Sequence, residues 1–328
     1  MNRLERRYRR LLWAYPANYR RERSEEIVGT YLDLAGPGRR WPSPADVADL
    51  VRGGLRQRLR AAGANDLLPG VRLAALLALT TATFLAGFWA VLEWQSPPAG
   101  AGVPAFGPFV SIGAVAWFAW LLAALLTLVA PGRPTRAAVA AAMLLTATTP
   151  LVSLVIDVPR PPLYVLLPPV VLGVLALAVD GRLPLAARVL PITAALAGAS
   201  LDAFWNRPGA YWGWYNWTAE QVLPAAGGAL LAVALLLAVG LGIRRDRRGW
   251  WTVMVLLTPV GLLNVHPLAG AVDGLASAAT RPTYPTMVAT AITVGLLGAA
   301  LLPAAVALRR RQVVPEPVAP CPTCGAHR

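Results

Sequence analysis

From residue 70 onward, long uncharged apolar runs alternate with short charged clusters. A membrane-spanning helix needs about 20 consecutive, mostly apolar residues. Most of the runs between neighbouring charges reach this length. We therefore predict eight transmembrane helices, at about 71–94, 106–130, 137–157, 162–180, 185–205, 221–243, 250–270 and 285–308.

The arginine positions favour eight spans over seven. The span at 185–205 is the least clear, because it contains Arg188 and Asp202. Cytoplasmic loops of membrane proteins carry an excess of basic residues. With eight spans and a cytoplasmic N-terminus, four basic clusters fall on the cytoplasmic side: residues 133–136, 182–188, 244–248 and 309–311. Omitting the unclear span would place the last two of these clusters on the outer side. We therefore predict a bacterial inner (plasma) membrane protein with both termini cytoplasmic.

Residues 1–62 show a different pattern, that of short amphipathic helices. In the first helix, apolar residues recur at the spacing of one helical face. They are Leu4, Tyr8, Leu11 and Leu12. Pro16 ends this helix, because proline has no N–H and its ring clashes with the preceding turn. A second helix is expected to run to about Leu34, before a Gly-Pro-Gly stop signal at residues 36–38.

A third helix is predicted from its start signal. Ser43 occupies the N-cap, Pro44 the first helical position, and Asp46 lies three residues after the serine, where a carboxylate can accept from free backbone N–H groups. This helix is expected to run to about Arg60. Four of its apolar residues are predicted to face inward: Val47, Leu50, Val51 and Leu55.

Composition supports the same fold class. Hydrophobic residues make up 56% and charged residues 14%, and the mean hydropathy is +0.54, as in membrane proteins. The predicted class is all-α: a small cytoplasmic three-helix domain (1–62), an eight-helix transmembrane bundle (70–308) and a cytoplasmic tail (309–328). The net charge of +14 is attributed to membrane topology, because the arginines cluster between the apolar runs.

One local pattern in the N-terminal domain resembles a known family. It reads Leu11-Leu12-x-x-Tyr15-Pro16-x-x-Tyr19-Arg20-x-x-Arg23-x-Glu25-Glu26, then Pro42-Ser43 and Asp49-Leu50-x-x-Gly53-Gly54-Leu55-Arg56-x-Arg58-Leu59. Over roughly the first 60 residues it resembles the HAAS signalling-domain family, whose members are small helical cytoplasmic modules on bacterial membrane proteins, often paired with a PadR-like transcriptional regulator. The resemblance does not extend into the membrane part.

This resemblance implies a cytoplasmic transcriptional regulator as partner, and it brings no catalytic residue with it. The main function hypothesis is therefore a signalling or regulatory membrane protein. The candidate partner-binding residues are Tyr15, Pro16, Tyr19, Arg20, Arg23, Glu25 and Glu26.

An aromatic-rich segment at residues 205–221 is a candidate ligand patch on the outer side. Its main aromatic residues are Trp205, Tyr211, Trp212, Trp214 and Trp217. The alternative is an interfacial belt, in which tryptophan and tyrosine lie at the headgroup level of the membrane. We favour the belt, because the segment has no cluster of polar groups that could orient a ligand.

A transporter, or an accessory subunit of an ABC transporter, is the alternative function. Ionisable residues in membranes commonly mark proton or ion pathways. The candidates are Asp157, Asp202, His266 and Asp273. All four are predicted at the outer ends of spans, which weakens this hypothesis. A purely structural membrane protein is a third alternative.

The C-terminal tail contains Cys321, Cys324 and His327, which resemble half of a zinc ribbon. Structural zinc prefers four ligands. A reduced, disordered tail is therefore favoured over a zinc site, and no other cofactor is predicted. Two cysteines in the last eight residues exclude a fold built on disulfides.

No enzyme is predicted, because the sequence has no nucleophile–base set, glycine-rich phosphate loop or HExxH motif. Direct nucleic-acid binding is disfavoured, because seven acids are interleaved with the arginines of the N-terminal domain and no recognition helix is evident. The predicted partners are the lipid bilayer and the cytoplasmic regulator. The pattern does not indicate an oligomeric state.

Overall fold

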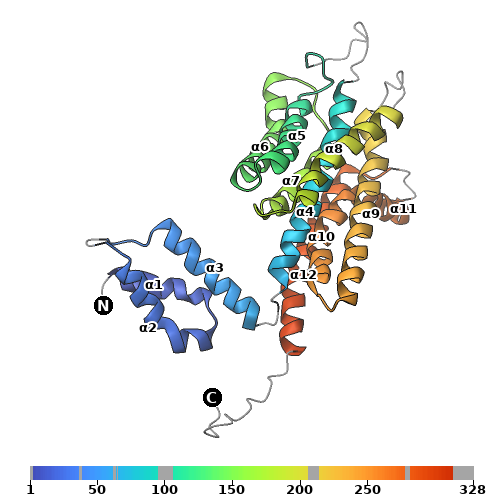
Figure 1. Cartoon of the computed structure of the whole chain (residues 1–328). Helices are drawn as coiled ribbons and strands as arrows, with labels where there is room; N and C mark the ends of the chain where they lie inside the picture. The colour runs from blue at the N-terminus through green and yellow to red at the C-terminus, as the bar shows by residue number, and fades with distance from the viewer. Residues whose placement is uncertain are drawn as a thin grey trace. The chain divides into compact units, whose positions relative to one another are not determined.

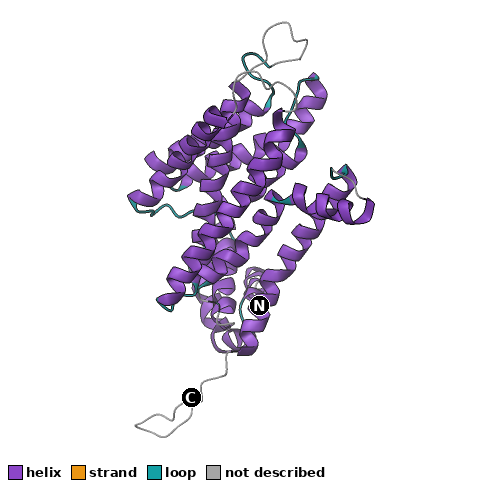
Figure 2. Cartoon of the chain, turned by 90° about the vertical axis from the view of Figure 1, so that its right-hand side faces the viewer, coloured by secondary structure: helices purple, strands orange, loops and turns teal. Residues whose placement is uncertain are grey.

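The computed structural model describes residues 3–36, 39–61, 64, 66–94, 106–205, 214–277 and 281–312. All regular secondary structure in these ranges is helical (Figure 2), which confirms the all-α class. The chain divides into two compact units, residues 1–67 with 301–328 and residues 68–300. Each unit is described by itself.

The N-terminal part of the first unit, here called the head, contains three α-helices and a 3-10 turn (Figure 1). These are α1 (Arg3–Leu11), η1 (Leu12–Ala14), α2 (Ala17–Asp33) and α3 (Pro44–Ala61). The head has its own apolar core, formed by Leu4, Tyr8, Leu12, Tyr15, Val28 and Leu50. Pro16 separates η1 from α2, as predicted.

The start of α3 confirms the predicted capping motif. The backbone N–H of Asp46 donates to Oγ of Ser43 (3.1 Å), and the N–H of Ser43 donates to Oδ2 of Asp46 (3.0 Å). The two residues thus satisfy each other's free backbone donors, as in a capping box. Tyr8 also donates to Oδ2 of Asp46 (2.8 Å), which ties α1 to the start of α3.

The predicted inward face of α3 is partly wrong. Leu50 is buried, but Val51 and Leu55 are 45% and 53% exposed. The buried face of α3 contains Gly54, where an added Cβ would overlap the backbone of Ala14. Since two helical segments can approach this closely only across small residues, a glycine face packs against η1 and the two larger residues point outward.

The described residues of the second unit form eight helices and the greater part of a ninth. They are α4 (Leu67–Trp94), α5 (Gly113–Val129), α6 (Arg133–Ile156), α7 (Leu163–Ala176), α8 (Leu185–Trp205), α9 (Trp214–Ile243), α10 (Arg248–Leu263), α11 (Val265–Ser277) and α12 (Tyr284–Gln312). Five of them, α4, α6, α8, α9 and α12, are long and apolar enough to cross a membrane. The described part of the chain thus has the helices of a multi-pass membrane protein.

Helix α4 is the centre of this unit. Its most apolar 18 residues are 78% buried, whereas the corresponding share in the other four long helices is 0–39%. Figure 1 shows α4 running among the other helices of the unit. Helix α8 packs closely against it, because an added Cβ at Gly87 would overlap the backbone of Ala195, and one at Gly198 would overlap that of Phe84.

The predicted span at 250–270 is not one straight helix. Helix α10 ends at Leu263, α11 begins at Val265, and their axes differ by 63°. Pro267 explains the break, because it has no N–H to donate to the carbonyl of Leu263 in a continuous helix. Asn264 caps the end of α10 instead, and its side-chain amide donates to the carbonyl of Val260 (2.8 Å).

Several helix ends meet at one end of this unit. Arg72, near the start of α4, pairs with Asp180 after α7 (3.1 Å). Arg136, near the start of α6, donates to the carbonyl of Val179 (3.0 Å). The hydroxyl of Thr252, near the start of α10, donates to the carbonyl of Gly70 (3.0 Å). The starts of α4, α6 and α10 therefore lie together with the end of α7.

Candidate functional site

The most prominent polar group inside the second unit is the carboxylate of Glu93. It lies one residue before the end of α4 and is fully buried. A buried carboxylate is costly unless hydrogen bonds replace the water that it has lost. Its partners come from two other parts of the chain, the segment before α5 and the start of α9.

Three donors surround this carboxylate. The backbone N–H of Ser111 donates to Oε2 (2.7 Å), and the hydroxyls of Ser111 and Tyr215 both donate to Oε1. A second layer orients these donors: Nε1 of Trp117 donates to the hydroxyl of Tyr215 (3.1 Å), and the N–H of Gly113 donates to Oγ of Ser111 (3.0 Å). We call Glu93, Ser111, Trp117 and Tyr215 the Glu93 cluster.

The direction of these hydrogen bonds is uniform. Because Trp117 donates to the Tyr215 hydroxyl, the hydroxyl proton is free to point at Glu93. Likewise Gly113 donates to Ser111, whose own proton points the same way. The carboxyl group therefore only accepts, which is the hydrogen-bonding requirement of a carboxylate. A fully satisfied buried network of this kind fixes the relative positions of the segments that supply it.

Aromatic rings close the space around the cluster. The Trp89 ring lies 5.1 Å from Tyr215 and 6.4 Å from Trp117, measured between centroids, and all three residues are buried. Nε1 of Trp89 has no hydrogen-bond partner among the described residues. Gly113 is required on the remaining side, because an added Cβ would meet Pro161 and Oε1 of Glu93.

Sequence reasoning missed this cluster. A signal was present, since Glu93 is the one charged residue between Arg72 and Arg133, and an isolated acid in an apolar run calls for a buried partner. The identity of that partner was not readable, because Tyr215 is 122 residues away.

The predicted outer aromatic patch falls partly outside the described residues. Tyr211 and Trp212 lie outside them. Trp205 ends α8, Trp214 begins α9, and Trp217 lies in the first turn of α9. The aromatic residue that the structure places in a site is their neighbour Tyr215.

The four residues of the predicted ion path have different surroundings. Asp157 is exposed and Asp202 is buried. Nε2 of His266 lies 3.4 Å from Oε1 of Glu220. Asp273 accepts from the N–H of Thr283 (2.6 Å) and from the Thr286 hydroxyl (2.7 Å). The partners given for His266 and Asp273 are thus other residues than the members of this set.

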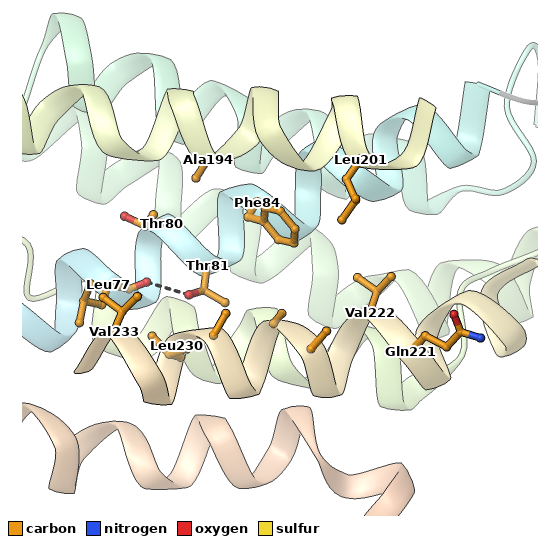
Figure 3. A pocket seen from close by; sticks show the side chains of 13 residues that line it. Leu77, Thr80, Thr81, Phe84, Ala194, Leu201, Gln221, Val222, Leu230 and Val233 are labelled. Carbon is orange, nitrogen blue, oxygen red and sulfur yellow. Dashed lines mark hydrogen bonds between the residues drawn. The ribbon is translucent and has the colours of Figure 1, made fainter. Parts of the chain in front are cut away.

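A cavity of about 390 Å³ lies between α4, α8 and α9 (Figure 3). Its lining is almost entirely apolar. Thr80 and Thr81 bring hydroxyls to it, but these donate to the carbonyls of Leu76 (2.8 Å) and Leu77 (3.0 Å) in the same helix. Gln221 lies at one end of the cavity, as Figure 3 shows. The lining suits a hydrocarbon chain better than a polar solute.

The predicted partner-binding residues of the head differ in exposure. Tyr15 is buried, and its ring stacks on that of Tyr19 at 5.3 Å. Pro16, Tyr19 and Arg20 are half-buried, and the Arg20 guanidinium lies 4.7 Å over the Trp13 ring. Arg23, Glu25 and Glu26 are exposed on α2. Tyr15 thus belongs to the core of the head, whereas Arg23, Glu25 and Glu26 lie on its surface.

Two acids of the head, Asp46 and Asp49, accept hydrogen bonds from its tyrosines. Burial, followed by the hydrogen bond to Asp46, raises the pKa of Tyr8 to about 12. Tyr31 donates to Asp49 (2.5 Å), and burial with this contact raises its pKa as well. The hydrogen bonds with Ser43, and then that from Tyr8, hold the pKa of Asp46 below its usual value.

The candidate zinc ligands Cys321, Cys324 and His327 lie outside the described residues. Within the part of the chain that is described, no group of three or more His, Cys, Asp or Glu side chains is arranged to hold a metal ion. No protein-family model matches the chain, and comparisons with curated proteins and with solved structures gave no match. The functional proposal therefore rests on the residues themselves and on the resemblance of the head.

Proposed function

We propose that this chain is a multi-pass protein of the bacterial inner membrane that works in signalling, with the head as the part that binds a cytoplasmic partner protein. By resemblance to the HAAS family, that partner is a PadR-like transcriptional regulator. The observation that carries the proposal is the separate apolar core of the head. A module with its own core is suited to present a defined surface to a partner.

The binding surface proposed is the exposed side of α2, with Arg23, Glu25 and Glu26. Its charges are mixed, which favours a protein partner over a nucleic acid, since a nucleic-acid surface is uniformly basic. Tyr19 supports this surface, with Arg23 6.0 Å over its ring.

The topology proposed has eight crossings with both termini in the cytoplasm. The five long apolar helices and the bent pair α10–α11 supply up to six candidate crossings. The proposal counts the shorter apolar helices α5 and α7 as the other two. Arginine clusters lie beside the meeting point of α4, α6, α7 and α10, which agrees with the excess of basic residues on the cytoplasmic side.

Two experiments test these proposals. The full-length protein in detergent is used as bait for the candidate regulator, next to a variant with Arg23→Ala, Glu25→Ala and Glu26→Ala. Retention by the wild type and loss in the variant are expected. Equal retention would reject the α2 surface, and no retention by either would reject the partner.

For the topology, reporter fusions after Arg133, Arg182, Arg248 and Arg311 should all indicate the cytoplasm. A periplasmic signal at Arg248 would refute eight crossings.

Transport is the weaker alternative. The cavity between α4, α8 and α9 is apolar, and the contacts described for Asp157, His266 and Asp273 do not connect them. Substituting Asp157 and Asp202 should leave solute flux unchanged if the signalling proposal is correct.

A further inference from the structure

The head has a second surface, on the side of α3 and η1. Trp13 is 68% exposed, and Val51 and Leu55 are 45% and 53% exposed. Arg58 connects them: its guanidinium donates to the carbonyls of Trp13 (2.5 Å) and Ala14 (2.7 Å), and Leu55 precedes it by one helical turn. We call Trp13, Val51, Leu55 and Arg58 the Trp13 surface.

This exposure follows from how the head packs. Helix α3 buries Leu50 and its glycine face, so Val51 and Leu55 point away from the core. In η1, Leu12 is buried and its neighbour Trp13 is therefore turned outward. Large exposed apolar side chains on neighbouring elements commonly mark a binding surface.

The charge around the Trp13 surface is basic. Arg52 and Arg56, each directly after one of the two apolar residues of α3, are exposed. Arg20 lies over the Trp13 ring. Residues 3–61 contain 14 arginines and 7 acids. The two carboxylates of α3, Asp46 and Asp49, accept hydrogen bonds from Tyr8 and Tyr31.

We propose that the Trp13 surface docks on the anionic surface of the membrane in which the protein is embedded. Tryptophan and arginine beside aliphatic residues are the combination that favours a lipid–water interface, where the ring lies at the headgroup level and guanidinium groups meet phosphates. Each basic residue held near an anionic leaflet adds to the attraction.

The covalent connection favours lipid over an acidic protein as the occupant. Helix α3 ends at Ala61 and α4 begins at Leu67, the first apolar helix of the chain. A short connection to a membrane helix makes lipid available at a high effective concentration without a separate binding partner. The proposal goes beyond partner binding by α2 and does not depend on it.

Cysteine labelling of the full-length protein in lipid nanodiscs tests the proposal. The background carries Cys321→Ser and Cys324→Ser, which removes both native thiols. The probe is Ala48→Cys, on the same side of α3 as Leu55, and the matched control is Thr30→Cys on α2. Both positions are exposed. Maleimide labelling rates are compared in discs of phosphatidylglycerol and of phosphatidylcholine.

Labelling at position 48 is expected to be about tenfold slower in phosphatidylglycerol, with the difference reduced at 0.5 M NaCl because salt screens the attraction. Position 30 should label equally in both lipids. Equal rates at position 48 in the two lipids would overturn the proposal. Equally slow labelling in both lipids at both salt concentrations would also overturn it, because it would indicate cover by protein.

Trp13→Ala should restore fast labelling at position 48 in phosphatidylglycerol. The matched control is Trp41→Ala. Trp41 is 67% exposed, lies just before the start of α3, and has the Arg7 guanidinium carbon 3.1 Å from its ring centroid. Fast labelling with Trp13→Ala alone supports the assignment. The same rate in both variants would overturn the assignment to the Trp13 surface.

Discussion

Replacing Tyr215 by phenylalanine removes one oxygen atom from the centre of the Glu93 cluster. The Tyr215 hydroxyl both donates to Glu93 and accepts from Nε1 of Trp117 (3.1 Å), so Tyr215→Phe breaks two hydrogen bonds. It leaves Trp117 with a buried N–H that has lost its acceptor, and Glu93 without the donor that comes from α9.

The expected destabilisation follows from these losses. Side-chain hydrogen bonds inside membrane proteins contribute about 0.6 kcal/mol on average and at most about 1.7 kcal/mol each. A buried donor left without an acceptor costs about 1–3 kcal/mol. The cost of the unpaired Trp117 donor already includes part of the lost hydrogen bond. We therefore expect the free energy of unfolding to fall by about 3 kcal/mol. At roughly 2–4 °C per kcal/mol for a domain of this size, the midpoint falls by about 6–12 °C.

Thermal unfolding of the full-length protein in detergent measures this shift. The matched control is Tyr284→Phe, which removes the same atom from a residue that is 58% exposed and is expected to change stability by less than about 0.5 kcal/mol. Because unfolding of membrane proteins is often irreversible, both variants and the wild type are scanned at one heating rate. If Tyr215→Phe unfolds at the same temperature as Tyr284→Phe, the cluster does not stabilise the fold as argued.

Two further predictions concern backbone packing and the head. Gly113→Ala should destabilise the protein by about 1–3 kcal/mol, because its Cβ would press on Pro161 and Glu93. Gly240→Ala, with open space around it, should be neutral or stabilising in the same thermal scan. Equal unfolding midpoints of the two variants would contradict the packing argument. Because its folded pKa is lowered, Asp46 stabilises the head fully above its unfolded pKa of about 3.9, and this contribution is lost as the pH falls through the lower folded value. Pepsin digestion of the head between pH 2 and 5 should therefore accelerate toward low pH in the wild type and vary less in Asp46→Asn, and coinciding profiles would show that Asp46 does not contribute.

The sequence by itself determined the helices and many of their ends. Pro16 and the Ser43–Asp46 cap act within a few residues of themselves, through a missing donor and through short-range hydrogen bonds, so no tertiary information is needed to interpret them. The all-α class follows in the same way, because apolar runs of this length are expected to satisfy their backbone groups as helices.

Only the tertiary structure decided which helix faces meet. In apolar helices every face is hydrophobic, so the pattern that marks a buried side in soluble proteins is lost. Small residues that allow close approach then decide the contact, as Gly87 and Gly198 do between α4 and α8. In the amphipathic head, Gly54 packs against Ala14 in the same way, and for this reason Val51 and Leu55 are exposed although the pattern predicts them inward. Polar groups far apart in sequence also decide which faces meet. Glu93 and Tyr215 are such a pair, and only the folded chain brings them together.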